Sequence, residues 1–557
     1  MRHFLFTFLT FLSLSLDGLT QLSNYPAYHP PLLLPQVLSA NFGELRPNHF
    51  HMGVDFKTNG KIGYNLYSIE DGYLARVKAS PYGYGKVIYI NHVDGRTSVY
   101  AHCSEFKGAI DSLVLAKQKE LQQFEVEIFP APNEIPLKKG EIIALSGNTG
   151  SSTAPHLHFE IRDTPSEAAM NPLVYGFQLA DNIAPEIRKL NVFAVNRDGY
   201  QYPQKVKEQA ISKVNGILKI TNDTLRIPAH FCSPTGGIGF AFDVIDKLNG
   251  APNQCAIYGT YFIVDGDTIF GQRMNQISFE ETRYINTHRV FNSNGKYHKS
   301  YKTVANPLGI YINDQLGIVS VHPGDVKSVQ LIAYDVNGNQ SHLQFILKVE
   351  NGEQSNDYAP DRTRYLYPND SLTQNGKNWS VKAGLNSVYE PTPIIESSLP
   401  HFCEASVLVQ NATEVRIKLE NPTLPIEKYF IAVATKGGQK ALSTTYEEGY
   451  LVAESKYAGK FSIQTDVTPP SIRGVSYNNA YTVKGDVITL KITETQTDLK
   501  EYKLFIDGAW HLLEYESKGD FLIFKRPAEI VGEHSIKITA KDACGNKVVY
   551  ERVLKFL

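Results

Sequence analysis

The sequence has little net charge and few cysteines. Its 557 residues carry 55 Lys and Arg against 57 Asp and Glu, for a net charge of −2. This balance argues against a nucleic-acid-binding protein and against a polybasic membrane anchor. The five cysteines show no Cys-x-x-Cys spacing, so a structural zinc cluster of thiolates is not expected. Cys232 and Cys255 could pair as a disulfide, but the sequence alone does not establish this pairing.

Long apolar runs are missing after the first residues of the chain. The run from Phe4 to Leu16 follows the basic start Met1-Arg2-His3 and is too short to span a bilayer. It is typical of the apolar part of a signal peptide, which we place at residues 1–20; an uncleaved buried segment is the alternative. We therefore expect an exported protein of the periplasm or cell envelope, with no transmembrane segment after signal removal.

Tyrosine (32) and phenylalanine (28) are abundant, and such aromatic enrichment favours strands. A chain of this length suggests three to five domains. Short apolar runs between glycines, such as Gly72–Val77, Lys86–Ile90 and Glu141–Leu145, predict strands in the first domain. Ala109–Glu125 has helical composition instead, which indicates an inserted helical segment. The fold class is therefore mainly β: a small antiparallel β domain with a helical insertion, then β-sandwiches.

The predicted domain borders follow composition and repeats. After the signal peptide we expect a Pro-rich leader that lies on the first domain as an extended strap. Beyond residue 176, strand-like runs recur without long helical periodicity, which suggests immunoglobulin-like sandwiches, the first of them with insertions such as 276–303. The predicted units are the leader at 21–35, a first domain at 36–176 with an insertion at 106–138, and β units at 177–350, 351–465 and 466–557.

Two of the β units share a short repeat. The segment that opens with Asp181 parallels the one that opens with Asp466, and each unit carries an Asp-x-x-Gly-Asn sequence near its end, at 335–339 and 542–546. A calcium loop is the alternative interpretation of these repeats, but each lacks the carboxylates that such a site needs. A hairpin turn before the last strand is the favoured interpretation.

A group of histidines and carboxylates in the first domain has the spacing of a metal site. In an extended strand, residues two or four positions apart point to one face, so His51 can share a face with Asp55, and His156 with His158. Leu157 and Phe159 would then point into a core. Two imidazoles and one carboxylate, with water in the fourth position, make a catalytic zinc site.

Seven segments of the first domain resemble the lysostaphin-type zinc metalloendopeptidases, which cleave peptide cross-links of bacterial cell walls. They are Phe42-Gly43, His51-x-Gly53-x-Asp55, Gly83-Tyr84-Gly85, Tyr100-Ala101-His102, Gly147-Asn148-Thr149-Gly150-Ser151, Pro155-His156-Leu157-His158-Phe159-Glu160 and Asn171-Pro172. The resemblance implies a small antiparallel β domain with Zn²⁺ in an open groove. It implies His51, Asp55 and His158 as zinc ligands and His102 and His156 as catalytic residues. Glu160 is better interpreted as a carboxylate that supports a ligand than as a general base.

The function implied by the resemblance is hydrolysis of peptidoglycan stem-peptide cross-links by zinc-activated water. The sandwich units would position the enzyme on the wall or on an envelope protein partner. The alternative is a non-catalytic or latent envelope scaffold that recognises the wall or activates another hydrolase. In that case the leader or the 106–138 insertion, which should border the groove, would mask the site.

Overall fold

The computed structural model describes residues 28–177, 179–290, 295–403, 408–476 and 481–557. The predicted signal peptide and residues 21–27 of the predicted leader lie outside these ranges. Strands dominate the described residues, and the α-helices are α1 (Gly108–Leu121) and the short α2 (Ile285–His288). The prediction of a mainly β chain is confirmed. In the described part of the chain, no helix combines the length and apolar character needed to cross a bilayer.

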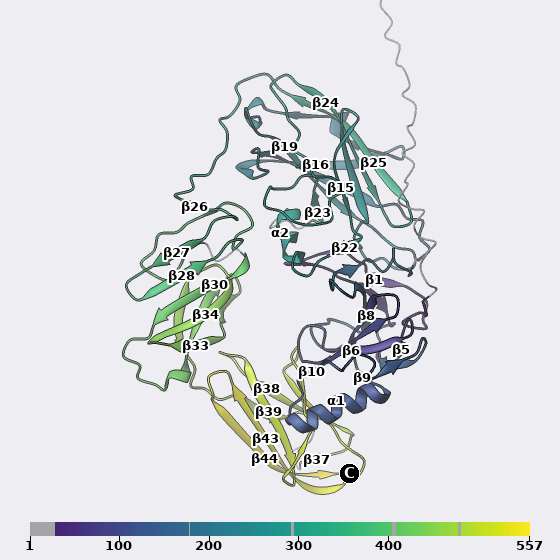
Figure 1. Cartoon of the computed structure of the whole chain (residues 1–557), viewed down its shortest axis with the longest axis vertical. Coiled ribbons are helices and arrows are strands. Elements are labelled where there is room, and N and C mark those ends of the chain that lie inside the picture. Colours follow the sequence, from purple (N-terminus) through teal and green to yellow (C-terminus); the bar gives the residue numbers. More distant parts are fainter. Residues whose placement is uncertain (1–27, 178, 291–294, 404–407, 477–480) are drawn as a thin grey trace, which may run out of the picture.

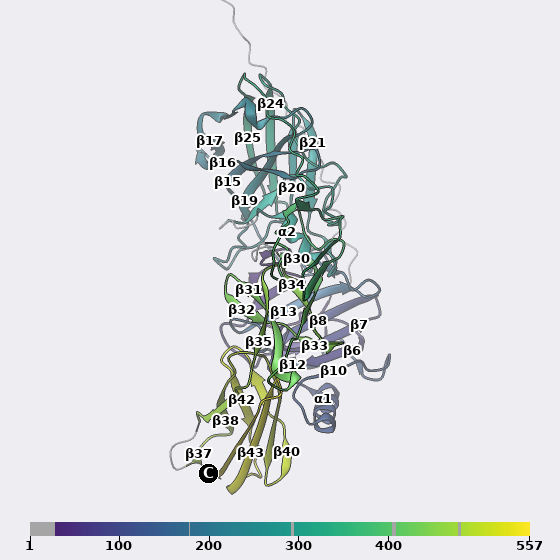
Figure 2. The ribbon, with the colours of Figure 1, turned by 90° about the vertical axis from the view of Figure 1, so that its left-hand side faces the viewer.

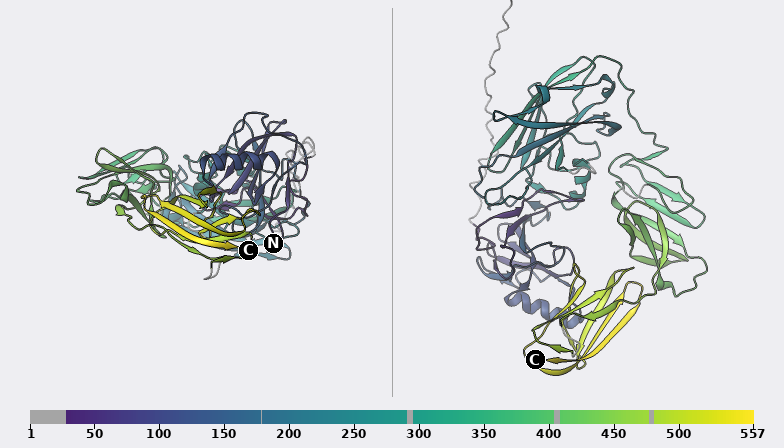
Figure 3. Two further views of the ribbon diagram at one scale, coloured as in Figure 1. Left: turned by 90° about the horizontal axis from the view of Figure 1, so that it is seen from below. Right: turned by 180° about the vertical axis from the view of Figure 1, so that it is seen from behind.

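The strands form four groups arranged in a closed loop (Figure 1). We name them the N-terminal unit (β1–β14), the first sandwich (β15–β25), the second sandwich (β26–β35) and the third sandwich (β36–β44). The edge-on view places the first and third sandwiches at opposite ends of the long axis (Figure 2). The view from behind shows the third sandwich returning to lie beside the N-terminal unit (Figure 3).

The N-terminal unit is built around one large, mainly antiparallel sheet. Its central path runs in the order β1-β4-β13-β8-β7-β6-β10, and a smaller sheet has the order β5-β12-β9. The strands are β1 (Leu38–Ala40), β2 (Leu45–Arg46), β3 (His49–Phe50), β4 (Val54–Lys57), β5 (Asn65–Tyr67), β6 (Gly72–Ala79), β7 (Lys86–His92), β8 (Arg96–Cys103), β9 (Glu105–Phe106), β10 (Val126–Ile128), β11 (Pro136–Leu137), β12 (Ile142–Leu145), β13 (His156–Asp163) and β14 (Ala169–Met170).

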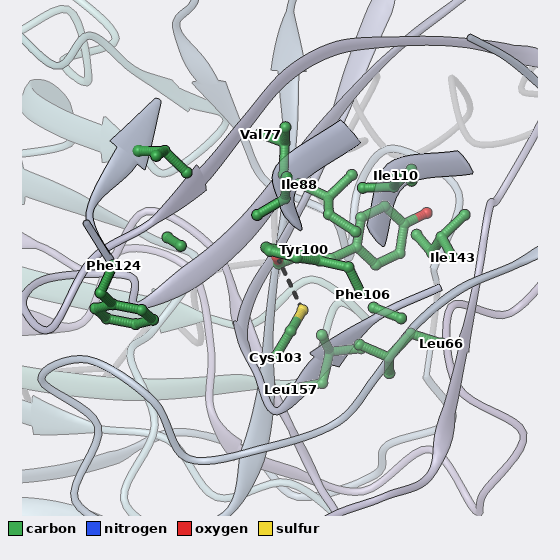
Figure 4. Packing of buried hydrophobic residues seen from close by; sticks show 14 of the residues in the cluster. Leu66, Val77, Ile88, Tyr100, Cys103, Phe106, Ile110, Phe124, Ile143 and Leu157 are labelled. Carbon is green, nitrogen blue, oxygen red and sulfur yellow. Dashed lines mark hydrogen bonds between the residues drawn. The ribbon is translucent and has the colours of Figure 1, made fainter. Parts of the chain in front are cut away.

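Strand β13 lies between β4 and β8 and supports the site residues. Its Leu157 and Phe159 side chains are fully buried, as the alternation of the sequence predicts. Leu157 belongs to the core beneath the sheet, where Cys103 also lies (Figure 4). The Cys103 thiol donates to the main-chain oxygen of Tyr100, and burial raises its pKa to about 12. Cys103 is therefore a core residue, in agreement with a small apolar role.

The leader and the insertion both lie on the N-terminal unit, but away from β13. In the described part of the leader, Leu32 pairs with Leu66, and Tyr67 donates its N–H to the Pro31 oxygen. In the insertion, β10 and β11 pair with β6, the strand on the far side of β7 and β8 from β13. The prediction that the insertion borders the groove is therefore wrong, because hydrogen bonding to β6 directs it to the outer edge of the sheet.

The first sandwich is one ten-stranded sheet that folds over on itself. Its main path is β21-β20-β24-β25-β17-β16-β15-β19-β23, with β18 beside β25. Phe240 of β19 packs 5.3 Å from Phe262 of β20, between ring centroids, so the two halves enclose a common core. The strands of this sheet are β15 (Glu186–Val195), β16 (Gln201–Val214), β17 (Ile217–Ile220), β18 (Thr224–Ile227), β19 (Gly237–Ile245), β20 (Gly259–Val264), β21 (Asp267–Arg273), β23 (Tyr297–Lys299), β24 (Val326–Tyr334) and β25 (Gln340–Val349). The short β22 (Gln276–Ile277) lies in the same stretch of chain but belongs to the sheet of the N-terminal unit.

The second and third sandwiches each pair a larger sheet with a smaller one. In the second, β27-β28-β30-β34-β33 faces β32-β31-β35; in the third, β37-β44-β43-β39-β40 faces β36-β38-β42-β41. The strands are β26 (Tyr365–Leu366), β27 (Leu372–Asn375), β28 (Trp379–Ala383), β29 (Thr392–Pro393), β30 (Leu408–Lys418), β31 (Tyr429–Thr435), β32 (Gly438–Ala441), β33 (Thr444–Glu447), β34 (Tyr450–Tyr457), β35 (Phe461–Thr465), β36 (Ser471–Gly474), β37 (Thr482–Val483), β38 (Val487–Thr493), β39 (Leu499–Ile506), β40 (Ala509–His511), β41 (Glu514–Glu516), β42 (Phe521–Lys525), β43 (Gly532–Asp542) and β44 (Lys547–Phe556).

The segment from β22 to β23, within the predicted 276–303 insertion, joins the first sandwich to the N-terminal unit. Strand β22 pairs with β14, and the Phe50 N–H donates to Thr282 Oγ1 at 2.9 Å. Buried apolar side chains from both units, including Met52 and Ile285, form a shared cluster. Cys255, at the same junction, is a buried free thiol, so a Cys232–Cys255 disulfide is not formed.

Candidate metal centre

Three donor atoms from His51, Asp55 and His158 meet in a small triangle. His51 Nε2 lies 3.1 Å from Asp55 Oδ1 and 3.0 Å from His158 Nδ1, and His158 Nδ1 lies 2.9 Å from Asp55 Oδ1. All three residues are more than nine-tenths buried. Strand pairing produces this meeting, because Asp55 on β4 stands directly opposite His158 on β13. The structure therefore brings together the three residues that the sequence assigns to one metal.

The backbone around His51 differs from the expected extended strand. Residues 51–53 lie between β3 and β4, so His51 and Asp55 do not share one strand face by simple alternation. The chain instead passes close under β13 at Gly53, where an added Cβ would come within 2.4 Å of the Phe159 oxygen. This close approach brings the His51 side chain towards His158 and explains the glycine of the motif.

Hydrogen bonds outside the triangle fix which ring nitrogen of each histidine faces it. His51 Nδ1 donates to the main-chain oxygen of Asn41 at 2.8 Å, and His158 Nε2 donates to Glu160 Oε1 at 2.8 Å. The other nitrogen of each ring then keeps its lone pair for a metal. Glu160 is fully buried and is itself held by Arg162 at 2.6–2.7 Å and by the Tyr84 hydroxyl. Glu160 thus supports His158, as the sequence analysis favours.

Two further histidines lie beside the triangle. The His102 and His156 ring centroids are 4.9 Å apart, and His156 Nε2 lies 3.5 Å from Asp55 Oδ1. His102 Nδ1 donates to the Thr149 oxygen at 2.9 Å, and His156 Nδ1 donates to the Ala154 oxygen at 2.8 Å. These bonds leave Nε2 of each ring as the nitrogen available to a bound molecule. His102 has a φ of 61°, an uncommon left-handed backbone for a non-glycine residue at a strand end.

Burial and close charges shift the pKa values of the group strongly. Burial opposes the charged form of Asp55, but His51 and its hydrogen-bonding neighbours hold the pKa of this carboxyl well below its usual range. Burial likewise opposes a charged His158, yet Asp55 and Glu160 raise its pKa to about 9. Burial, followed by the charges of His158 and His156, lowers the pKa of His102 to about 3. His158 therefore holds a proton between two carboxylates, and a metal must displace that proton.

The donor set fits a zinc ion. Two imidazole nitrogens and a carboxylate oxygen are the protein ligands of many catalytic zinc sites. In a tetrahedron with bonds of about 2.0–2.1 Å, ligand atoms stand roughly 3.3 Å apart. The observed edges of 2.9–3.1 Å are close to this value. Once the proton on His158 is displaced, three lone pairs face one another in a buried site, and a cation between them offsets their repulsion.

Several supporting residues were not identified from the sequence. Asn41 and Arg162 act on the ligands through hydrogen bonds that depend on chain crossings, and no local pattern marks them. The Arg162 guanidinium also lies 4.1 Å from the ring centroid of Phe279, which belongs to the first sandwich. Within the described residues, none of the recorded hydrogen bonds, ion pairs or ring contacts of the five predicted site residues comes from the leader or from residues 106–138. Masking by these segments therefore has no structural support.

The fold and the donor triangle define a small antiparallel β domain with a candidate hydrolytic metal centre. Residues 49–119, which include His51, Asp55 and His102, match Peptidase family M23. The N-terminal unit is therefore similar to an M23 peptidase domain over these residues.

Relatives and solved structures match the same part of the chain. The chain is 32% identical over 134 residues to the peptidoglycan DD-endopeptidase ShyB of Vibrio cholerae serotype O1, covering 24% of this chain and 25% of the relative. It is 30% identical over 128 residues to lysostaphin of Staphylococcus simulans, covering 22% and 21%. The solved catalytic domain of that lysostaphin is 26% identical, with a TM-score of 0.18, and is covered to 95%, against 28% of this chain. The match thus spans only a fifth to a quarter of the length of these curated relatives.

Proposed function

We propose that the protein is an exported zinc metalloendopeptidase that hydrolyses peptide cross-links of peptidoglycan. The observation that carries this proposal is the triangle of His51, Asp55 and His158, whose edges and hydrogen-bonded tautomers suit a single zinc ion. The M23 match supports a peptidase activity, and the named activity of the similar V. cholerae peptidoglycan DD-endopeptidase supports a peptidoglycan substrate.

His51 Nε2, Asp55 Oδ1 and His158 Nδ1 would hold the metal. When bound, a zinc ion supplies Lewis acidity that polarises an amide carbonyl and lowers the pKa of water. Asn41 and Glu160 keep the two rings in the required tautomer and orientation. Because the three ligands lie on or beside the central strands β4 and β13, their geometry is set before substrate binds.

His102 and His156 would serve as the proton-transfer and oxyanion-stabilising residues. Their Nδ1–H groups are fixed on main-chain oxygens, so each ring presents Nε2 on the side of the metal ligands. A neutral Nε2 can take a proton from an attacking water, and the resulting N–H can return it to the leaving amine. The second ring, once it has taken a proton from solvent on Nε2, can donate from that atom to the oxyanion that forms on the carbonyl oxygen. Because burial and the nearby His158 and His156 lower the pKa of His102 to about 3, this ring starts the reaction neutral.

The sandwich units would position this domain on the wall or on an envelope protein partner. The proposed units remain the leader at 21–35, the peptidase domain at 36–176 and the β units at 177–350, 351–465 and 466–557. The similar V. cholerae enzyme is a DD-endopeptidase, and the glycyl-glycine endopeptidase ALE-1 of Staphylococcus capitis is 33% identical to the chain over 111 residues, so both kinds of cross-link belong in the test.

The test is digestion of purified peptidoglycan, of the directly cross-linked type and of the pentaglycine type, by the mature chain, with mass spectrometry of the products. Cross-linked dimers should disappear in a reaction that needs metal and is lost in His158→Ala. His49→Ala, a change at an exposed histidine next to the motif, is the matched control. His102→Ala and His156→Ala should keep one equivalent of zinc while kcat falls roughly 100-fold or more. Absence of cleavage by a chain that holds one equivalent of zinc would overturn the proposal in favour of a scaffold.

A further inference from the structure

The Asp-x-x-Gly-Asn sequence of the first sandwich forms a hydrogen-bonded turn between β24 and β25. Asp335 Oδ1 accepts the Asn339 N–H at 2.9 Å, and Asp335 Oδ2 accepts the Asn339 side-chain amide at 2.7 Å. The same amide donates to the main-chain oxygen of Asp181 at 3.1 Å. The turn therefore does form, as the sequence analysis favours, and it also fixes the segment that enters the first sandwich from the peptidase domain.

Two more carboxylates reach this turn from other parts of the chain. Asp181 lies on the connection before β15, and Asp246 follows β19 directly. One carboxylate oxygen from each of Asp181, Asp246 and Asp335 lies within 4.8 Å of the others. The shortage of carboxylates in the sequence motif is thus made up by residues 154 and 89 positions before Asp335, which only the fold brings to it.

Asp246 is the unusual member of this group. The residue is 2% exposed, and its Oδ1 is buried with no hydrogen-bond partner. Asp181 Oδ2 is also buried without a hydrogen-bond partner. Across the described ranges, none of the three carboxylates takes part in a recorded salt bridge with a lysine, arginine or histidine, and Lys247 beside them pairs with Glu186 instead.

Like charges in such surroundings are costly unless a cation or a proton offsets them. Burial, followed by the charges of Asp335 and Asp181, raises the pKa of Asp246 to about 8. Burial also raises the pKa of Asp335. A buried carboxylate oxygen without a hydrogen bond or a counter-ion is destabilising, and a divalent cation that binds one oxygen from each aspartate would remove this cost.

We propose that Asp181, Asp246 and Asp335 bind a calcium ion that locks the first sandwich to the peptidase domain. Carboxylate oxygens are the preferred ligands of this hard cation, which takes six to eight oxygens in flexible geometry. The three aspartates supply three of them, and main-chain oxygens and water supply the rest. This site is chemically distinct from the histidine-containing triangle, since it offers only oxygen atoms.

The third sandwich brings carboxylate oxygens of Asp466, Glu494 and Asp542 within 4.8 Å of one another at the same turn, but none of the oxygens of these three described residues is buried without a hydrogen-bond partner. Asp542 accepts hydrogen bonds from the main-chain N–H and from the side-chain amide of Asn546. Asp466 Oδ2 accepts the Thr497 hydroxyl at 2.9 Å. The Lys428 ammonium donates to Asn546 Oδ1 at 2.5 Å, so a positive charge is already present at this turn. We therefore expect one calcium site in the chain, in the first sandwich.

A series of hydrogen bonds connects the proposed calcium site to the peptidase domain. Asp246 and Cys255 form a two-hydrogen-bond bridge, each N–H donating to the other's oxygen at 2.9 Å. The next residue, Ala256, exchanges two hydrogen bonds with the side chain of Asn41, whose own main-chain oxygen accepts from His51. A cation that fixes Asp246 would therefore steady the segment that holds Asn41 and, through it, the His51 ring.

The experiment is calorimetric titration of Ca²⁺ into the full chain, purified with chelator and reloaded with one equivalent of zinc so that the histidine site is filled. We expect one Ca²⁺ per chain and an upward shift of the thermal unfolding midpoint with Ca²⁺. Asp246→Asn should weaken Ca²⁺ binding at least tenfold and remove the shift. Asp267→Asn, on an exposed hairpin of the same sandwich, should leave both unchanged.

Asp181→Asn is the second variant, because this half-exposed residue can change with less effect on folding. It should also weaken Ca²⁺ binding while zinc content stays at one equivalent. Lack of Ca²⁺ binding and of a midpoint shift in the unmodified chain would overturn the proposal and leave a proton on Asp246 as the offsetting charge. Full Ca²⁺ binding by both variants would overturn it too. These outcomes do not depend on peptidoglycan cleavage, so the two proposals fail separately.

Discussion

The Nδ1–H of His51 donates to the main-chain oxygen of Asn41 at 2.8 Å, and Asn41 is in turn hydrogen-bonded to the first sandwich. The Asn41 side chain donates to the Ala256 oxygen at 2.8 Å and accepts the Ala256 N–H at 2.7 Å. Asn41 is 6% exposed, so water does not compensate for the loss of these bonds. The first sandwich thus helps to orient a predicted zinc ligand.

Replacing Asn41 by alanine should therefore weaken both the domain junction and the metal site. The change leaves the N–H and C=O of Ala256 buried without partners, at a cost of about 2–4 kcal/mol. We expect a lower thermal midpoint and weaker zinc binding in competition with a chelator. Gln254→Ala, an exposed polar residue two positions before Ala256, is the control and should change neither. An Asn41→Ala chain with unaltered zinc affinity would show that the His51 ring is oriented by other contacts.

Glu160→Gln tests the carboxylate behind His158. Glutamine can still accept the hydrogen bond from His158 Nε2, but it has no negative charge. The His158 ring therefore becomes a weaker electron donor to the metal, and the ion pair with Arg162 is lost. We expect zinc affinity to fall about 10–100-fold, as measured by chelator competition. Glu167→Gln, on the exposed turn after β13, provides the same chemical change away from the site. Equal zinc affinity in both variants would contradict a supporting role for Glu160.

The first sandwich should lose stability in mild acid because it buries two neutral histidines. His288 Nε2 lies 3.1 Å from His298 Nδ1, and burial lowers the pKa of His298 to about 4 and that of His288 well below its usual value. In the unfolded chain each histidine takes up a proton as the pH falls through about 6.5. In the folded chain the same two histidines stay neutral until the pH is lower, so acid favours the unfolded state. The stabilising difference is thus complete above pH 6.5 and is lost as the pH falls towards 4, by up to about 1.4 kcal/mol per pH unit for each histidine.

The measurement is urea unfolding at pH 7.5, 6 and 5. In His288→Gln the free energy of unfolding should fall less steeply between pH 7.5 and 5, because glutamine takes up no proton when the chain unfolds. His322→Gln is the control, because the His322 side chain is 66% exposed. A profile that is unchanged by His288→Gln would mean that acid acts elsewhere in the chain.

The Lys86–Glu514 ion pair should contribute to the position of the third sandwich beside the peptidase domain, together with a hydrogen bond from Ser517 to the Pro81 oxygen. The Lys86 ammonium lies 3.0 Å from Glu514 Oε1 and donates to the Ser104 oxygen at 3.1 Å, and Lys86 is 7% exposed. Glu514→Gln should cost about 1.5–3 kcal/mol, the usual range for a hydrogen bond to a charged group. We expect faster limited proteolysis at this junction, with Glu533→Gln, exposed in the same sandwich, as control.

A double-mutant cycle separates this pair from general damage. Lys86→Met alone should destabilise the junction, and adding Glu514→Gln should cost little more, because the ion pair is already broken. Fully additive effects of the two changes would show that the pair does not couple the two units.

The sequence by itself determined the local chemistry. The His-x-His spacing on one strand, with Leu157 and Phe159 between and after the histidines, follows from the period of two in any extended chain, and the structure shows both apolar side chains buried. The mainly β class and the helical segment at 109–125, observed as α1 at Gly108–Leu121, follow from composition and periodicity in the same way. These features depend on neighbours within a few residues, which the sequence displays directly.

Only the tertiary structure decided which distant residues share an environment. The insertion lies at β6 and away from the site because main-chain hydrogen bonds can form with any exposed strand edge, and no side-chain pattern specifies which edge. Asn41 reaches Ala256, and Asp246 reaches Asp335, only through crossings between separate strands. Such contacts between residues far apart in the chain depend on how whole units pack, so a carboxylate count confined to one motif missed the cluster in which Asp246 is buried.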